Sequence, residues 1–157
     1  MAITVPLALA YEFAVHARYA EVFSVLADVP TSASHFPKLA RLVDLGDQRY
    51  RWEMEKLGTD TLHLQTVYAA QYVANKRQGR VDWTPLAGIG NAQVGGSWVL
   101  SNKKTYTQLV LRINAQLQLP LPGLMKSLVA PVVQAEYQAL VEQYIDKLIQ
   151  RFGGEHV

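Results

Sequence analysis

Residues 105–119, with the sequence TYTQLVLRINAQLQL, determine the fold class of this chain. Apolar residues occupy every odd position from 109 to 119, and polar side chains occupy the even positions from 112 to 118. A period of two is typical of a β-strand with one face on the core and the other in water. Fully extended, this strand would be about 50 Å long. We therefore expect it to curl within its sheet.

A helical pattern follows this strand directly. Pro120, Pro122 and Gly123 end the strand, and apolar residues then recur at helical spacing up to Phe152. Pro131 either kinks one long helix or occupies the first turn of the main helix. We expect the helix, roughly 131–152, to lie across the concave face of the sheet. Its buried residues should include Val133, Tyr137, Leu140 and Tyr144.

The chain begins with a different arrangement. Residues 9–15 alternate as a half-buried strand, and helical spacing replaces the alternation between Tyr19 and Ala27. The helix is expected to end at residues 28–30, because Pro30 disfavours a helical conformation in the residue before it. A second short helix is predicted over residues 31–36, with Thr31 or Ser32 as its N-cap.

Residues 39–119 return to a period of two, interrupted by Gly, Asn, Asp and Pro clusters. The short connections predict antiparallel hairpins in a meander. The overall prediction is an α+β fold, a curved antiparallel sheet of about seven strands around a long C-terminal helix. The strands of this region are expected at Leu39–Leu45, Tyr50–Leu57, Thr61–Ala74, Gly79–Thr84, Gln93–Leu100 and Thr105–Leu119.

Length and composition describe a globular chain but not its function. Half of the 157 residues are hydrophobic, 18% are charged and cysteine is absent. We expect a single domain over residues 1–157. The lack of cysteine excludes disulfide scaffolds and thiol chemistry. A net charge of +2 gives no reason to expect a nucleic-acid partner. No Lys or Arg precedes the apolar start, so we expect no signal peptide and a cytoplasmic protein.

The order of these segments resembles the START/Bet v 1-like helix-grip superfamily, also called SRPBCC or the polyketide cyclase/dehydrase and lipid-transport family. Local details are similar to its coenzyme Q-binding-protein-like branch. One departure is the short link at 45–49, where the pollen-allergen branch has a glycine-rich loop, and no phosphate-binding role is inferred from it. The stretches that carry the resemblance are EFAVHARYAEVFSVLADV (12–29), YRWEMEKLG (50–58), GRVDW (79–83), GGSWVL (95–100), TQLVLRI (107–113) and LPLPGLMKSLVAPVVQAEYQALVEQYIDKL (119–148).

The resemblance implies an elongated apolar cavity between the sheet and the final helix, suited to a lipid, isoprenoid quinone, sterol or polyketide-like ligand. Strand parity independently places all three tryptophans on the concave side. They could equally be ordinary core packing. For a ligand site we expect a cavity of roughly 300 to 1,000 Å³. The predicted ligand-binding residues are Trp52, Leu64, Tyr68, Trp83, Trp98, Leu111, Val133 and Tyr137.

Catalytic and metal sites are not predicted. Glu53 and Glu55 lie two apart on one strand, but on its outward face, where solvated carboxylates are the ordinary interpretation. The histidines nowhere show the i, i+4 spacing of a zinc site, and no cofactor is expected. The histidines are His16, His35, His63 and His156.

Three functions stay open at this stage. The first is binding or transport of an apolar small molecule without catalysis. The second is a cyclase or dehydratase in which Tyr68 or Tyr72 donates a proton to a polyketide-like substrate. The third is an interaction module for a macromolecule, as in ribosome-associated relatives of the superfamily. An inward cluster of ionisable residues would favour the enzyme, whereas a broad, flat, basic patch would favour the module.

Basic residues gather at two hairpins. Such residues commonly keep strand edges soluble. They could instead make transient contact with anionic lipid head groups, each basic residue contributing about 1 kcal/mol. The residues concerned are Lys76, Arg77, Arg80, Lys103 and Lys104.

Overall fold

The computed structural model describes residues 3–58 and 63–157. Its main feature is a seven-stranded antiparallel sheet in the order β1-β9-β8-β7-β6-β3-β2, beside a separate two-stranded sheet of β4 and β5. The elements are β1 (Ile3–Val15), α1 (Tyr19–Ala27), α2 (Val29–Ala33), β2 (Leu39–Gly46), β3 (Arg49–Met54), β4 (Leu57–Gly58), β5 (His63–Leu64), β6 (Val67–Asn75), β7 (Arg80–Pro85), β8 (Ala92–Asn102), β9 (Thr107–Leu119), η1 (Gly123–Met125) and α3 (Lys126–Arg151).

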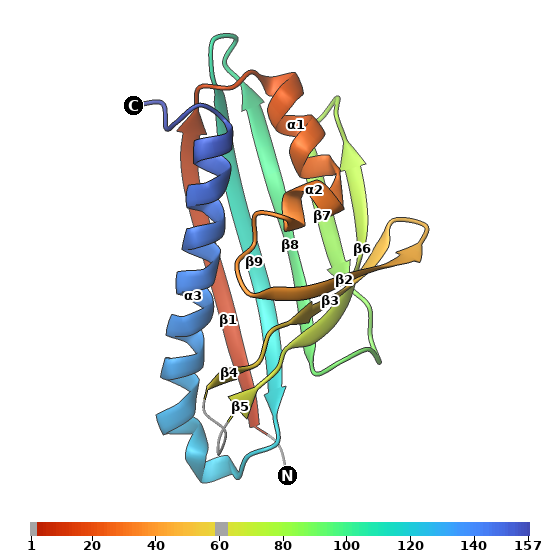
Figure 1. Cartoon of the computed structure of the whole chain (residues 1–157), viewed down its shortest axis with the longest axis vertical. Helices are drawn as coiled ribbons and strands as arrows, with labels where there is room; N and C mark the ends of the chain where they lie inside the picture. Colours follow the sequence, from red (N-terminus) through yellow and green to blue (C-terminus); the bar gives the residue numbers. More distant parts are fainter. Residues whose placement is uncertain (1–2, 59–62) are drawn as a thin grey trace.

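The sheet confirms the predicted meander. Strands β2, β3, β6, β7, β8 and β9 pair in chain order, and β1 closes the other edge beside β9. β1 is longer than the predicted 9–15, because its ladder with β9 runs unbroken from Ile3 opposite Leu119 to Val15 opposite Thr107. Figure 1 shows β2 and β3 crossing in front of the longer strands, so the sheet curls around its concave face.

Two predicted strands differ from the observed ones by more than a few end residues. The strand expected over 50–57 leaves the main sheet after Met54, and the one expected over 61–74 is divided into β5 and β6. The reason lies in Asn91, whose Oδ1 accepts a hydrogen bond from the Val67 N–H at 2.9 Å while its Nδ2 donates to the Gln65 carbonyl at 2.9 Å. This side chain takes the place of a strand partner at the interruption. Residues 61 and 62 of the predicted strand lie outside the described residues.

Helix α2 begins earlier than predicted. It occupies Val29–Ala33 instead of 31–36, with Pro30 in its first turn and Asp28 at the N-cap. Proline is favoured there because the first turn needs no N–H from it and its φ is already helical. Ser32 is therefore not a cap but a residue inside the helix, and it is buried.

Helix α3 is one continuous helix of 26 residues, and Pro131 lies inside it rather than in its first turn. It begins at Lys126 rather than near 131. The four residues expected to be buried beneath it, Val133, Tyr137, Leu140 and Tyr144, are all buried. Figure 1 shows α3 lying along β1 and β9, with α1 and α2 beside it over the same face of the sheet.

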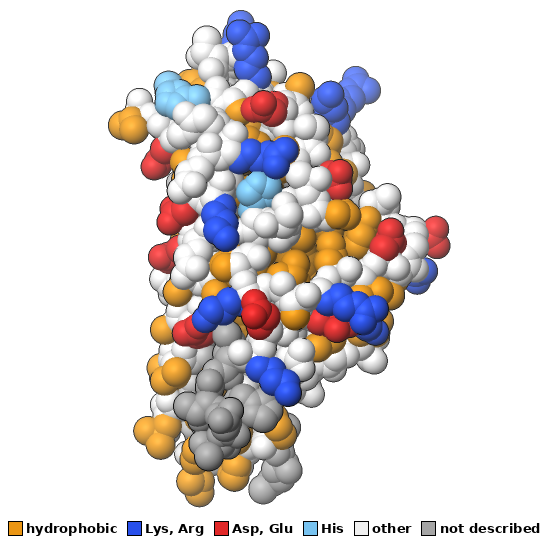
Figure 2. All heavy atoms as spheres, viewed as in Figure 1, with side chains coloured by type: hydrophobic (Ala, Val, Ile, Leu, Met, Phe, Trp, Pro, Cys, Tyr) orange, Lys and Arg blue, Asp and Glu red, His pale blue; other side chains and the backbone are white. Residues whose placement is uncertain are grey.

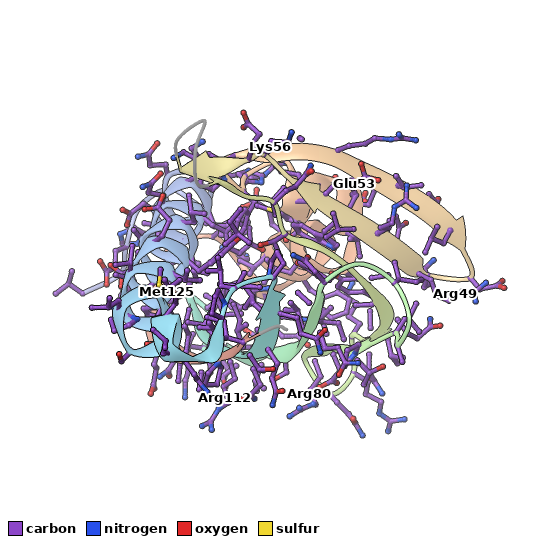
Figure 3. The ribbon with its side chains drawn as sticks, turned by 90° about the horizontal axis from the view of Figure 1, so that it is seen from below. Arg49, Glu53, Lys56, Arg80, Arg112 and Met125 are labelled. Carbon is purple, nitrogen blue, oxygen red and sulfur yellow. The ribbon has the colours of Figure 1, made fainter. Side chains whose placement is uncertain are left out.

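The core lies on the concave face and the polar residues of β9 lie on the other. Leu109, Leu111, Leu117 and Leu119 are at most 3% exposed, whereas Arg112 is exposed. Figure 3 shows Arg80 and Arg112 pointing away from the interior. Among the described residues, no helix is both long and apolar enough to cross a membrane.

Candidate functional site

A small cavity lies where the sheet, α2 and α3 meet. Five strands contribute to its wall, together with the end of α1, α2, the loop after α2, and α3. None of its lining residues is a carboxylate, a histidine or a basic residue. The lining residues are Leu26, Val29, Ser32, Phe36, Trp52, Tyr68, Tyr72, Val81, Trp83, Val94, Trp98, Leu111, Ile113 and Tyr144.

Stacked aromatic rings form one side of this cavity. Trp52 of β3 lies parallel to Tyr68 of β6, with 5.7 Å between ring centroids and 11° between planes. Tyr72, four residues further along β6 and on the same face, stacks on Trp83 of β7 at 5.9 Å. Gly96 makes room for the Trp83 indole, because a β-carbon there would come within 2.6 Å of Trp83 Cζ2. The wall is thus built from large, rigid and weakly polar faces.

Several residues of the cavity lining carry hydroxyl groups. The Trp52 indole N–H donates a hydrogen bond to the Tyr72 hydroxyl at 2.9 Å. Across the interior, the Ser32 and Tyr144 hydroxyls are 2.5 Å apart and hydrogen-bonded. The Tyr68 hydroxyl has no hydrogen-bond partner among the described residues. The cavity can therefore offer uncharged hydrogen-bond donors and acceptors.

The phenols of this site stay protonated at neutral pH. Burial raises the pKa of Tyr144 to about 12, against a smaller opposing effect of its hydrogen bond with Ser32. Burial also raises the pKa of Tyr68 well above its usual range, and it raises that of Tyr72 although the Trp52 hydrogen bond lowers it. These groups act as neutral hydroxyls, not as phenolates.

The cavity is much smaller than predicted. Its volume is about 60 Å³, whereas ligand pockets usually measure roughly 300 to 1,000 Å³. The predicted volume is wrong because strand parity places the aromatic side chains inside but does not say how closely they pack. In this conformation the space holds only a few water molecules.

Phe36 closes one side of the site. It follows α2 and contacts Trp52 edge-on at 5.9 Å between centroids and Tyr144 at 5.3 Å. It is half-buried and packs against all three hydrophobic clusters of the interior. Two residues on, Lys38 has a φ of 58° and forms an ion pair with Glu136 of α3 at 3.6 Å. This loop thus links α2 and β2 to the long helix.

The structure brings together five of the eight predicted ligand-binding residues. Trp52, Tyr68, Trp83, Trp98 and Leu111 line the cavity. The other three belong to the neighbouring hydrophobic cluster beneath the first half of α3. They are Leu64, Val133 and Tyr137, of which Leu64 and Val133 pack with Ile3 and Leu117 while Tyr137 hydrogen-bonds the Thr66 hydroxyl.

Sequence reasoning missed Ser32 and Phe36. Ser32 looked like an N-cap, and Phe36 was expected to be the last residue of a short helix. One signal for the two residues was available in the sequence. They lie next to or near Pro30 and Pro37, and these prolines indicate a short connection between α2 and β2. Nothing in the local pattern indicates that this connection turns inward.

The carboxylates considered for catalysis, Glu53 and Glu55, lie outside the cavity, whereas Tyr68 and Tyr72 line it. Glu53 is ion-paired with Arg51, with 2.6 Å between its Oε2 and Arg51 Nη2, and Glu55 is exposed. In the space-filling view the charged side chains are scattered around the face that carries the helices (Figure 2). The side chain of His63 lies outside the described residues. Within the described residues, no group of three or more metal-ligating side chains occurs.

The basic hairpins lie at the end of the sheet where α1 begins. Lys76 and Arg77 occupy the β6–β7 turn, and Lys103 and Lys104 the β8–β9 turn, all exposed. Arg80 differs from them because its guanidinium pairs with Asp82 at 2.9 Å.

Comparison with known proteins places this architecture. No protein-family model matches the sequence, and no curated protein does. Among solved structures, a START superfamily protein from Mycobacterium smegmatis superposes with a TM-score of 0.68 at 14% identity, over 93% of this chain and 97% of that one. This chain has the helix-grip fold.

Two further structures share the helix-grip fold. A conserved protein from Geobacillus kaustophilus matches with a TM-score of 0.65 at 14% identity, over 98% of both chains. The Zhui aromatase/cyclase from Streptomyces sp. R1128 matches with a TM-score of 0.60 at 16% identity, over 92% of this chain and 90% of that one. Because these identities are low, the likeness describes the fold and leaves the ligand open.

Proposed function

We propose that this protein binds an uncharged, largely apolar small molecule, such as a lipid, an isoprenoid quinone or a polyketide-like compound, in the aromatic cavity. The observation that carries the proposal is the lining itself. Its residues combine stacked aromatic rings with neutral hydroxyls and include no ionisable group that is charged at neutral pH. Apolar walls with a few placed polar groups are typical of small-molecule sites.

The chemistry of the lining restricts the ligand. Burying an unpaired charge is costly, so a ligand with an ionised group would have to leave that group at the surface. A carbonyl or hydroxyl oxygen could instead meet the hydroxyl of Tyr68, Tyr72 or Tyr144. A planar ring would fit against Trp52 or Trp83 by stacking. A quinone or an aromatic polyketide has both features.

Binding requires the cavity to expand. At about 60 Å³ it is too small for any of these ligands. Phe36 is the side chain best placed to move, since it is half-buried on a loop and touches both Trp52 and Tyr144. Withdrawal of its ring would join the cavity to the solvent between α2 and α3. The neighbouring Lys38–Glu136 ion pair would then hold the loop closed over a bound ligand.

A second candidate is a cyclase-type enzyme. It is favoured by the inward hydroxyls, because a protonated phenol such as Tyr68 can donate a hydrogen bond to a developing oxyanion. The solved structures with this fold include proteins described as aromatase/cyclases. A general base is needed as well, and the raised pKa of each phenol makes it a poor base at neutral pH. Binding without catalysis therefore stays the preferred function.

The proposal is tested by tryptophan fluorescence. Purified protein is titrated with a polyprenyl quinone, a fatty acid and an aromatic polyketide. Saturable quenching is expected for at least one of them, because Trp52, Trp83 and Trp98 all line the cavity. Trp83→Ala and Trp98→Ala should weaken binding, and Arg80→Ala, whose partner is Asp82 on the outer face, should leave it unchanged.

Phe36→Ala sharpens the same experiment. Removing the ring should accelerate ligand association, whereas Phe23→Ala serves as a matched control for the loss of a phenylalanine away from the cavity lining. Absence of quenching by the whole panel, in wild type and in Phe36→Ala alike, would contradict the proposal and leave the aromatics a structural core. Turnover of the polyketide, rather than simple binding, would favour the enzyme.

A further inference from the structure

Every polar side chain of the aromatic cavity can donate a hydrogen bond. The described residues of its lining carry four hydroxyl groups and three indole N–H groups, and none of them has a carboxylate, amide or imidazole side chain. A hydroxyl oxygen can also accept a hydrogen bond, whereas an indole N–H can only donate one. The side chains of the lining therefore have more protons to donate than oxygen atoms to accept them.

Hydrogen bonds within the lining use only some of these protons. The Ser32 and Tyr144 hydroxyls bond each other at 2.5 Å. The Trp52 indole N–H donates to the Tyr72 hydroxyl at 2.9 Å, so the Tyr72 oxygen accepts, and its own proton has no acceptor in the described part of the chain. The Tyr68 hydroxyl has no partner there at all. Tyr68 and Tyr72 are thus phenols that still have a proton to donate.

The two phenols lie close together in one wall. Both belong to β6, and a separation of four residues places them on the same face of the strand. Trp52 is the cross-strand partner of Tyr68 and stacks on its ring. Because the same indole donates to Tyr72, the Tyr72 hydroxyl leans along the strand toward Tyr68. This proximity adds to the effect of burial in raising the pKa of Tyr68.

The Tyr68 hydroxyl faces open space rather than protein. Each fully enclosed side-chain nitrogen or oxygen of the described residues has a hydrogen-bond partner. The Tyr68 hydroxyl has none, and its residue lines the cavity. It is therefore directed at the cavity, where an unpaired hydroxyl is unfavourable. A ligand oxygen placed there would supply the missing partner.

We propose that the ligand carries a carbonyl group and that the hydroxyls of Tyr68 and Tyr72 donate hydrogen bonds to its oxygen. A carbonyl oxygen accepts two hydrogen bonds and brings no proton of its own, so it suits two adjacent donors better than an alcohol does. This proposal rests on the proposed function and narrows its ligands to ketones and quinones. Tyr68 is the residue that selects them.

Three compounds with one planar skeleton test the proposal. They are 9-fluorenone, 9-hydroxyfluorene and fluorene, which differ only at one carbon. Equilibrium dialysis should show that wild type binds the ketone most tightly, then the alcohol, then the hydrocarbon. In Tyr68→Phe the affinity for the ketone should fall about threefold to tenfold, the usual worth of one neutral hydrogen bond. The affinity for fluorene should be unchanged.

A control variant and a spectroscopic measurement separate recognition from a structural effect. Tyr137→Phe also removes a buried tyrosine hydroxyl, but one that bonds Thr66 outside the cavity lining. It should keep the wild-type ratio of ketone to hydrocarbon affinity. Because a hydrogen bond weakens the C=O bond, the infrared carbonyl band of bound 9-fluorenone should lie at lower wavenumber in wild type than in Tyr68→Phe. Circular dichroism checks that each variant is folded.

The outcomes distinguish this proposal from the proposed function. The carbonyl proposal is overturned if fluorene or 9-hydroxyfluorene binds wild type as tightly as 9-fluorenone, or if Tyr68→Phe loses affinity equally for all three. Both results would leave the binding of an apolar ligand intact. If none of the three binds, in wild type and in Phe36→Ala alike, the carbonyl proposal is also overturned, and the fluorescence panel decides the proposed function separately.

Discussion

Two regions of the interior lie beneath the same helix and differ in what fills them. Around Tyr144, aromatic rings and hydroxyls enclose a cavity of about 60 Å³. Around Tyr137, seven residues earlier in α3, aliphatic side chains such as Leu117 and Leu140 pack in a cluster whose buried members do not line the cavity. Phe36, Tyr68 and Val94 pack against this cluster and also line the cavity, so the two regions adjoin. In both regions a tyrosine hydroxyl meets a hydroxyl from the facing element, Ser32 in one and Thr66 in the other.

The difference shows how side-chain shape controls space in this fold. Leucine and valine have short branched side chains that interdigitate with few gaps. Indole and phenol rings are flat and rigid, and here they stack in pairs beside the cavity. Strand alternation is identical in the two regions. We infer that the aromatic region can accept a ligand, whereas the aliphatic region mainly stabilises the fold.

The largest expected effect on stability comes from the aliphatic region. Leu140 is 2% exposed, and Leu140→Ala should lower the free energy of unfolding by about 2–5 kcal/mol through lost burial and the cavity that it leaves. Urea denaturation measures this loss. The affinity for a quenching ligand should change less than twofold, provided that the measurement is made where the variant is folded. A large loss of ligand affinity in folded Leu140→Ala protein would show that the aliphatic region also takes part in binding.

Alkaline pH should weaken the aromatic region. Burial raises the pKa of Tyr68, Tyr72 and Tyr144 in the folded state, so between the unfolded value near 10 and the folded values the native state binds more protons than the unfolded one. The free energy of unfolding should therefore be insensitive to these groups below pH 10 and fall as pH rises above it. Denaturant titrations at pH 8 to 11 measure the trend. Stability that increases above pH 10 would contradict the burial of these phenols.

The paired tyrosines offer a finer comparison. Tyr144→Phe and Tyr137→Phe each remove one hydroxyl and leave a buried partner, Ser32 or Thr66, without its hydrogen bond. Each should cost about 1–2 kcal/mol of stability. Only Tyr144→Phe should alter ligand affinity, since Tyr144 lines the cavity and Tyr137 does not. Equal changes in affinity for the two variants would show that the ligand reaches both regions.

The smallest effects belong to the outward carboxylates. Glu53→Ala and Glu55→Ala should each change stability by less than about 1 kcal/mol, because exposed groups and surface ion pairs contribute little. Ligand uptake should be unchanged in both. Thermal melts and the fluorescence titration measure these quantities. If either variant abolished ligand uptake or turnover, the assignment of this face to solvent would be wrong. A cyclase-type enzyme would then be the preferred function.

Much of the fold could be predicted from the sequence because burial on one face imposes a period of two on the strands. Residues 109–119 show this most clearly, and the long helix follows from its own period. The break between β5 and β6 could not be predicted, since it depends on the side chain of Asn91, a residue 24 positions away from its partner Val67.

The sequence predicts which face of the sheet carries the site, but not the volume of the cavity. Parity placed Trp52, Trp83 and Trp98 inside, and all three line the cavity. How they stack, and that Phe36 folds in from a loop to meet Trp52, depends on long-range packing that no local pattern encodes.

Native mass spectrometry of protein isolated from its own host tests this account most directly. Wild-type protein should carry a bound, uncharged, apolar molecule. Trp83→Ala protein should carry much less of it, because the variant loses one stacking wall of the cavity, while Arg80→Ala should retain it. Bare wild-type protein, or the same adduct at the same occupancy in Trp83→Ala, would contradict the claim that the aromatic cavity is the binding site.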